Sequence, residues 1–224
     1  MKTEVIYCGM IERELLAAAR KCSADLPMRR VEEGLHNTPA KLTERLQEEL
    51  DRTAPETERV LLAFSFCGNA LAGLKTGDYE LIVPRADDCI TLLLGSYQTR
   101  LETQREAQSY FLTEGWLKGG KSIWDEYCHA VSRYGDRRAK SVFRSMLQHY
   151  KRLLVIDSGV SEMPQLLERT EEIAKTLSLR HEVRPGTLAF LEQLLSGPWD
   201  AENFLRVPPH TTLSVCDLIL PQTE

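Results

Sequence analysis

Three cysteines and one histidine stand in stretches of sequence that are typical of turns following buried strands. Each of Cys8, Cys67 and Cys89 has a glycine or an aspartate close by, and His36 comes just before a predicted helix. Three thiols and one imidazole form a ligand set for zinc, and soft thiolates also hold iron–sulfur clusters. The sequence therefore predicts a metal site made of Cys8, His36, Cys67 and Cys89.

Three further side chains are candidates for acid–base or binding roles. Asp88 is a possible fifth ligand, or a partner that fixes the tautomer of His36. Arg85 is suited to bind an anionic group or to pair with a nearby aspartate. His149 precedes a predicted strand, where an imidazole can act as a general acid or base near neutral pH or simply pack at a helix end.

Other interpretations of the cysteines stay open. Cysteine is among the most buried residue types, so each thiol can be an ordinary part of the core. A thiolate nucleophile at Cys67 or Cys89 is a further alternative, because a helix N-terminus lowers the pKa of a thiol. We expect the remaining cysteines to serve only in packing: Cys22, Cys128 and Cys216.

The strands that must position these residues are short apolar runs that alternate with amphipathic helices. We expect strands at residues 4–7, 26–31, 60–66 and 79–83, and helices at residues 11–22, 39–52 and 89–94. This alternation predicts an α/β fold with a mainly parallel, doubly wound (Rossmann-like) sheet and helices on both faces. In such a sheet, ligands bind beyond the carboxyl ends of the strands.

We expect the chain to form one α/β domain over residues 1–224, with a mainly helical insertion over 98–152. Glycines at 115, 119 and 120 interrupt the helical pattern of that insertion. Beyond it, the pattern predicts a strand at 153–156, a helix at 164–179 and short strands at 182–184 and 204–207.

Composition and absent motifs exclude several classes of protein. A net charge of −5 and the lack of a basic, aromatic-rich run argue against a nucleic-acid partner. No apolar stretch approaches the roughly 20 residues of a membrane span, and the first residues contain no signal-peptide core, so we expect a cytoplasmic protein that does not bind membranes. The sequence contains no CxxC, GxGxxG, GxxxxGK[ST] or GxSxG motif, which disfavours zinc ribbons, dinucleotide enzymes, P-loop NTPases and serine hydrolases.

Several motifs resemble those of the domain-of-unknown-function family numbered sixteen thirty-eight, which is found in methanogens and other anaerobes. The resemblance rests on CGMIEREL at 8–15, LHNTPAKL at 35–42, FCGNALAGL at 66–74, PRADDCITLLLGS at 84–96, YFLTEGW at 110–116 and HYKRLLVIDSG at 149–159. The motifs of the family centre on Cys8, His36, Cys67 and Cys89. Proteins of this kind often accompany corrinoid-dependent methyltransferase systems, which implies a role in one-carbon transfer.

Three functions follow as hypotheses. The first is a metal-dependent methyltransferase, in which zinc activates a substrate thiol and the partner is a corrinoid protein or another methyltransferase. The second is a non-catalytic accessory protein that holds a corrinoid or an iron–sulfur cluster. The third is a regulatory or interaction module with ordinary buried thiols. The sequence predicts neither the substrate nor the oligomeric state.

Overall fold

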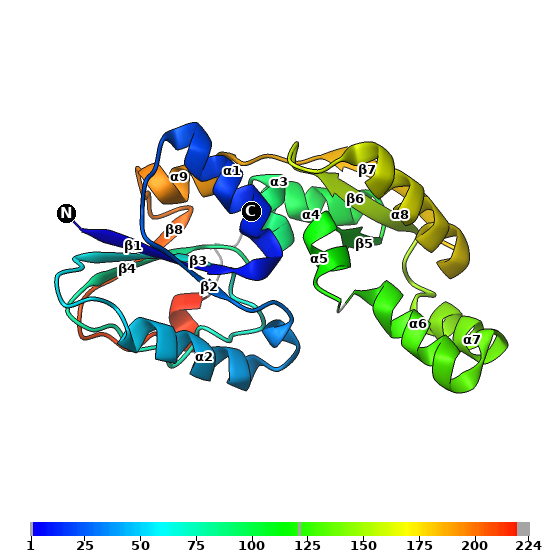
Figure 1. The fold of residues 1–224 in the computed structure, drawn as a ribbon, viewed down its shortest axis with the longest axis horizontal. Helices are drawn as coiled ribbons and strands as arrows, with labels where there is room; N and C mark the ends of the chain where they lie inside the picture. Colours follow the sequence, from blue (N-terminus) through cyan, green and yellow to red (C-terminus); the bar gives the residue numbers. More distant parts are fainter. Residues whose placement is uncertain (1, 121, 219–224) are drawn as a thin grey trace. The chain divides into compact units, whose positions relative to one another are not determined.

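The structure, a computed structural model, describes residues 2–120 and 122–218. The chain divides into two compact units. Unit 1 comprises Met1–Gln98 and Leu188–Glu224, and unit 2 comprises Thr99–Thr187 (Figure 1). Each unit has its own sheet and its own helices.

Unit 1 is built on a five-stranded sheet in the order β2-β1-β3-β4-β8. The first four strands in this order are parallel, and β8 pairs with β4 in the antiparallel direction. This sheet confirms the predicted α/β, Rossmann-like fold. The strands are β1 (Thr3–Cys8), β2 (Met28–Val31), β3 (Arg59–Ala63), β4 (Glu80–Pro84) and β8 (Phe204–Val207).

Helices cover both faces of the unit 1 sheet. Helices α1 and α9 lie on one face and α2 lies on the other (Figure 1). The central strand β3 therefore has no exposed apolar side chain, and Leu61 and Leu62 are completely buried. A strand buried on both faces appears in the sequence as a continuous apolar run, which is why it was predictable. The helices of this unit are α1 (Glu12–Cys22), α2 (Pro39–Asp51), α3 (Cys89–Leu94) and α9 (Ala189–Ser196), with short 3₁₀ helices η1 (Gly9–Ile11), η2 (Leu35–Asn37) and η3 (Val215–Leu218).

Helix α2 shows how one helix of this layer is formed. Leu42, Leu46 and Leu50 recur every fourth residue and lie on one buried face of the helix. Pro39 occupies its first position, where the missing N–H costs no hydrogen bond. Burial of this leucine face against the sheet fixes α2 beside the loop that carries His36.

Unit 2 contains a second, smaller sheet with three parallel strands in the order β5-β6-β7. The strands are β5 (Ser109–Leu112), β6 (Arg152–Asp157) and β7 (Arg180–Pro185). The helices are α4 (Tyr97–Glu106), which begins at the junction with unit 1, α5 (Glu114–Lys118), α6 (Ile123–Tyr134), α7 (Asp136–Met146) and α8 (Met163–Leu177). Helix α6 begins with a capping box in which Ser122 and Asp125 bond each other's backbone N–H groups.

Unit 2 differs in two ways from the helical insertion expected over residues 98–152. It extends to Thr187, and it contains β5, a strand that the sequence did not predict. Strand β5 has only four residues, which are too few to show the alternation of apolar and polar residues typical of a strand, and the helical patterns on either side hid it. As a result, β6 is the central strand of a separate sheet rather than part of the main one.

Across the described ranges, no helix is both long enough and apolar enough to cross a membrane.

Candidate functional site

The sheet of unit 1 brings two of the predicted ligands to neighbouring strand ends. Cys8 is the last residue of β1, and Cys67 follows the end of β3, which pairs with β1 in parallel. Ionisation of Cys67 would raise the pKa of the Cys8 thiol, and the charge of Asp88 raises the pKa of the Cys67 thiol. We call these three residues, Cys8, Cys67 and Asp88, the thiol edge.

Cys8 is held as a neutral thiol. Burial, the largest cause, raises its pKa from 9.0 to about 12. A hydrogen bond from the backbone N–H of Met10 opposes this increase, as does the charge of Arg30, whereas the charge of Glu33, and that of Cys67 when it is ionised, add to it. A thiol with this pKa is fully protonated at neutral pH, so an added metal ion would have to displace a proton from it.

Cys67 lies at the start of a left-handed turn. Three successive residues have positive φ angles: 45° at Cys67, 65° at Gly68 and 69° at Asn69. Residues with side chains visit this region at a cost of roughly 1–2 kcal/mol each, and usually one at a time. The turn persists because its backbone is bonded to the loop after β4, with Phe66 N–H donating to Ala86 O at 2.7 Å and Cys67 N–H to Asp87 O at 3.2 Å. Backbone strain of this kind clusters at functional sites.

The thiol of Cys67 is also protonated at rest. Burial raises its pKa and the charge of Asp88 adds to the increase, whereas a hydrogen bond with Ser65 opposes it. The Ser65 hydroxyl lies 3.1 Å from the Cys67 sulfur. The alternative of a thiolate nucleophile at Cys67 is wrong in its physical basis, because the residue enters a turn rather than a helix and its pKa is raised rather than lowered.

Asp88 has a second task, which is to begin helix α3. Its carboxylate accepts a hydrogen bond from the backbone N–H of Thr91 at 3.0 Å, and the Thr91 hydroxyl donates to Asp87 at 2.5 Å. Cys89 is the first residue of this helix and is partly buried. The cap holds Asp88 in place while its charge acts on Cys67.

The other candidates lie at three different places. His36 is partly buried in η2, in the loop after β2, the strand that pairs with the other side of β1. Arg85 follows β4; the pKa of Asp217 is lowered mainly by hydrogen bonds from Ser214, and the charge of Arg85 adds to the decrease. His149 is exposed in a turn of unit 2, whereas the thiol edge belongs to unit 1.

The thiol edge brings two cysteines to neighbouring strand ends but does not form a complete metal site. Within residues 2–120 and 122–218, no three or more His, Cys, Asp or Glu side chains form a group arranged to hold a metal ion. Cys8 and Cys67 lie at the ends of neighbouring parallel strands, and both thiols are partly buried. A site that also used His36 and Cys89 would need side chains to reorient when the ion binds. The four-ligand site stays a prediction.

A pocket of about 360 Å³ opens beside the turn that carries Cys67. Its lining comes from the turn itself, the loop after β4, the first residue of α4 and the end of η3, all within unit 1. The lining residues are Phe66, Gly68, Asn69, Asp87, Tyr97 and Leu218. This volume falls in the range of small-molecule sites. The sequence patterns did not identify Asn69 and Tyr97 as candidate site residues. An asparagine directly after Cys-Gly is a signal for a left-handed turn, whereas the sequence around Tyr97 contains no signal for a site.

The six thiols are all free, but they differ in exposure. We expected Cys128 and Cys216 to pack in the core, which is wrong, because both are exposed. On α6, Tyr127 is buried, so its neighbour Cys128 faces away from the core. In α6 the sequence IWDEYCHAV places apolar residues next to one another, so the helix period did not mark Cys128 as exposed.

Alkylation at neutral pH is expected to label Cys128 and Cys216 at least about 100-fold faster than Cys8 and Cys67, because only the exposed thiolate reacts. The increase in the pKa of Cys8 from 9.0 to about 12 alone lowers its thiolate fraction about a thousandfold. Peptide mass spectrometry after timed quenching measures each rate. The control is protein unfolded in urea, in which all cysteines should react at similar rates; rapid labelling of Cys8 in the folded protein would contradict the assignment.

Comparison with known proteins adds the family but not an activity. No curated protein and no solved structure matches the chain. One family model matches residues 30–195, a range that includes His36, Cys67 and Cys89 and begins after Cys8. Since this match covers more than half of the chain, the chain belongs to the family described as protein of unknown function DUF1638.

Proposed function

We propose that the thiol edge binds a soft metal ion, zinc before others, with Cys8 and Cys67 as its central ligands. The observation that carries the proposal is the placement of these two cysteines at the carboxyl ends of neighbouring parallel strands, Cys8 at the end of β1 and Cys67 shortly after the end of β3. Thiolates are preferred ligands of zinc, and a metal ion replaces the protons that burial otherwise retains on them. The remaining ligand candidates are Asp88, Cys89 and His36.

The proposed role of this site is methyl transfer from a corrinoid protein to a thiol, in the cytoplasm. Bound zinc would supply Lewis-acid activation of the substrate thiol, provided that one coordination position stays open. The contribution of the chain would be to hold the two cysteine ligands on a rigid sheet edge, and the pocket beside Asn69 offers space for a small substrate. Six free thiols suit a reducing compartment. A corrinoid or an iron–sulfur cluster is the alternative cofactor, in an accessory rather than catalytic role.

A regulatory or interaction module with buried thiols is the second candidate. The observation that favours it is the raised pKa of both thiols together with the absence, over the described residues, of a three-ligand group. In that case Cys8 and Cys67 would contribute only to the packing of the unit 1 core, with which both are in contact. Metal content separates the two candidates.

Elemental analysis of full-length protein purified without oxygen is expected to find about one zinc ion per chain. The double variant that carries Cys8→Ser and Cys67→Ser is expected to bind zinc at least about 100-fold more weakly, because two thiolate ligands are lost. The control carries Cys128→Ser and Cys216→Ser, which removes two exposed thiols and should leave the affinity unchanged.

Three outcomes decide between the candidates. Equal zinc affinity in the wild type and the Cys8/Cys67 variant, or no metal in a protein that keeps its fold, would contradict the zinc proposal. A visible absorption spectrum in the purified protein would favour the iron–sulfur or corrinoid alternative. Affinity that falls as the pH is lowered would support thiol ligands, because protons compete with the metal ion for them.

A further inference from the structure

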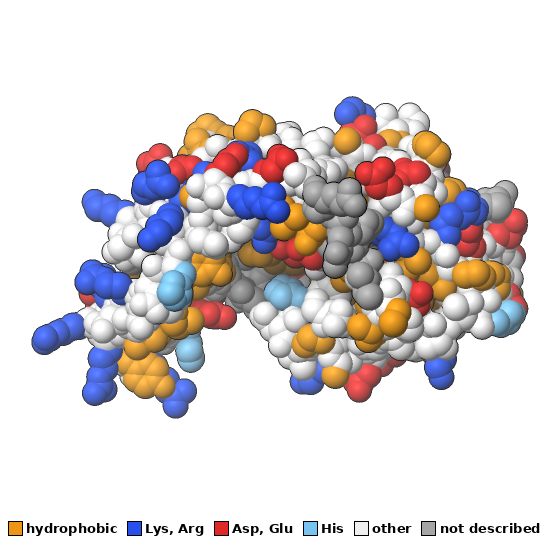
Figure 2. All heavy atoms as spheres, turned by 180° about the vertical axis from the view of Figure 1, so that it is seen from behind, with side chains coloured by type: hydrophobic (Ala, Val, Ile, Leu, Met, Phe, Trp, Pro, Cys, Tyr) orange, Lys and Arg blue, Asp and Glu red, His pale blue; other side chains and the backbone are white. Residues whose placement is uncertain are grey.

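The two units carry opposite charge. Unit 1 contains 13 Lys and Arg against 21 Asp and Glu, a net charge of −8, whereas unit 2 contains 15 against 12, a net charge of +3. Figure 2 shows Lys and Arg side chains gathered over the α6–α7 end of unit 2. An acidic protein that concentrates positive charge on one part of its surface provides a place for an anionic ligand there.

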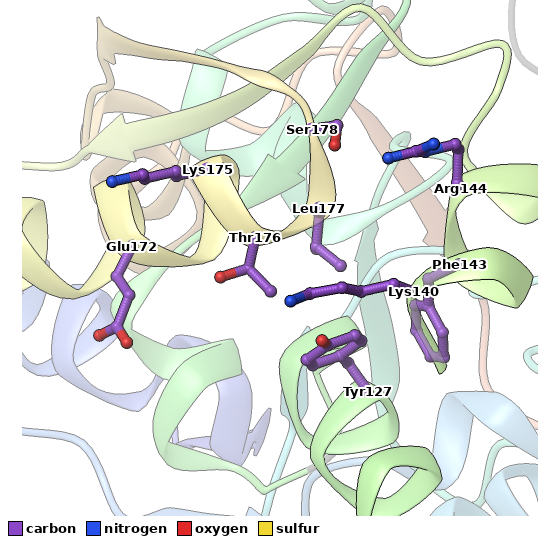
Figure 3. Close-up of a pocket in the computed structure, with 9 residues that line it drawn as sticks. All are labelled: Tyr127, Lys140, Phe143, Arg144, Glu172, Lys175, Thr176, Leu177 and Ser178. Carbon is purple, nitrogen blue, oxygen red and sulfur yellow. The ribbon is translucent and has the colours of Figure 1, made fainter. Parts of the chain in front are cut away.

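A pocket of about 520 Å³ lies within unit 2, beside this basic end (Figure 3). Three helices contribute to it: α6, α7 and the last two turns of α8 with the residue that follows. The lining residues are Tyr127, Lys140, Phe143, Arg144, Glu172, Lys175, Thr176, Leu177 and Ser178. The volume matches the range of small-molecule sites, and the three basic side chains outnumber the single acidic one.

The polar groups of the pocket are suited to an oxyanion. Figure 3 shows Lys140 extending between Tyr127 and Thr176, and Arg144 pointing toward Ser178. Among the described residues, Arg144 has no ion-pair partner. Lys140 pairs with Asp136 at 2.8 Å, but both side chains are about half exposed, so this pair contributes little to stability and can yield to a ligand. An ammonium, a guanidinium and two hydroxyl groups are thus available for one ligand.

The floor of the pocket is apolar. Tyr127, Phe143 and Leu177 are each at most 5% exposed, and the two rings meet edge to face with centroids 5.4 Å apart. The Tyr127 hydroxyl donates to Asp136 at 2.8 Å, which fixes the ring. A rigid apolar floor below flexible cations suits a ligand that joins a charged group to a less polar body.

We propose that this pocket binds a phosphorylated small molecule, with the phosphate held by Lys140 and Arg144. The guanidinium of Arg144 can donate two parallel hydrogen bonds to phosphate oxygens, while Lys140 adds a point charge. Thr176 and Ser178 supply hydroxyl donors for the third oxygen. A phosphate uses all these donors, whereas a single carboxylate has only two oxygens to offer them. The site lies in unit 2 and is independent of metal binding in unit 1.

Calorimetric titration of the full-length protein with inorganic phosphate and with pyrophosphate tests this site. We expect pyrophosphate to bind more tightly than phosphate, and succinate, a dicarboxylate, to bind at least about tenfold more weakly than pyrophosphate. Lys140→Gln and Arg144→Gln should each weaken pyrophosphate binding about tenfold, since each removes a charge-assisted contact. Arg144→Lys keeps the charge but loses the paired donors, so its affinity for pyrophosphate should lie between those of the wild type and Arg144→Gln.

The matched control is Arg138→Gln, which removes one positive charge from the same helix outside the lining of the pocket. It should leave pyrophosphate affinity within about twofold of the wild type. An equal loss in Arg138→Gln would show a general effect of charge and overturn the proposal. So would the failure of both phosphate and pyrophosphate to bind, or binding that is unchanged in Lys140→Gln and Arg144→Gln.

Discussion

Replacing Arg152 with alanine is expected to lower the free energy of unfolding of unit 2 by about 3–5 kcal/mol. The Arg152 side chain is almost completely buried at the start of the central strand β6. It donates hydrogen bonds to the Ser109 hydroxyl at 2.6 Å, to the Thr103 carbonyl at 2.8 Å, to Glu182 at 2.6 Å and to Glu106 at 3.3 Å. One guanidinium therefore ties α4, β5 and β7 to β6.

The size of this effect follows from what the substitution leaves behind. Thr103 and Ser109 are buried, and without the guanidinium their oxygen atoms would lose a donor that water cannot easily replace. Glu182 would lose a close charge partner as well. Breaking a buried charged network by removing one member is much more costly than removing an exposed ion pair.

Arg180→Ala is the matched control for Arg152→Ala. Arg180 pairs with the same carboxylate, Glu182, at 3.3 Å, but its side chain is 67% exposed, so its loss should cost less than about 1 kcal/mol. Urea denaturation followed by tryptophan fluorescence measures both variants, with the unfolding of the two units fitted separately. Similar losses for Arg152→Ala and Arg180→Ala would show that the buried network does not stabilise unit 2.

The second large effect is a dependence of stability on alkaline pH. The pKa of Cys8 in the folded protein is raised from 9.0 to about 12. Below pH 9 the Cys8 thiol is protonated in both the folded and the unfolded protein. Burial of the neutral thiol then contributes fully to stability. Between about pH 9 and 12 the unfolded chain releases the proton while the folded protein retains it, so stability falls by about 1.4 kcal/mol per pH unit for this group.

In Cys8→Ala, the free energy of unfolding should therefore decrease less steeply above pH 9 than in the wild type, with a slope smaller by about 1.4 kcal/mol per pH unit. Denaturation curves of metal-free protein, collected between about pH 8 and 11, give this slope, and any packing defect of the variant affects all pH values equally. A residual slope is expected, because Tyr7, Tyr110 and Tyr127 also have pKa values raised to about 12 by burial. Cys128→Ala, at an exposed position, should keep the wild-type slope; an unchanged slope in Cys8→Ala would contradict the burial of that thiol.

The amino-acid sequence by itself determined the main sheet and the edge at which the cysteines gather. Strands such as β3 and β4 are buried on both faces, so they appear as short apolar runs, and glycine and aspartate mark where they end. Parallel strands place their carboxyl ends on one edge, which is why Cys8 and Cys67 could be expected at the same side of the sheet. The family also followed from local motifs, because these are contiguous in the chain.

Only the tertiary structure decided features that join residues far apart in the chain. It placed β6 in a second sheet with β5, buried Arg152 among partners from three other elements, and brought the α6, α7 and α8 residues of the basic pocket together. It also showed the left-handed turn at Cys67 and the burial that raises the pKa of the Cys8 thiol. The physical reason is that hydrophobic periodicity reports which face of an element is buried, whereas pairing, exposure and pKa depend on the particular atoms that another segment brings against it.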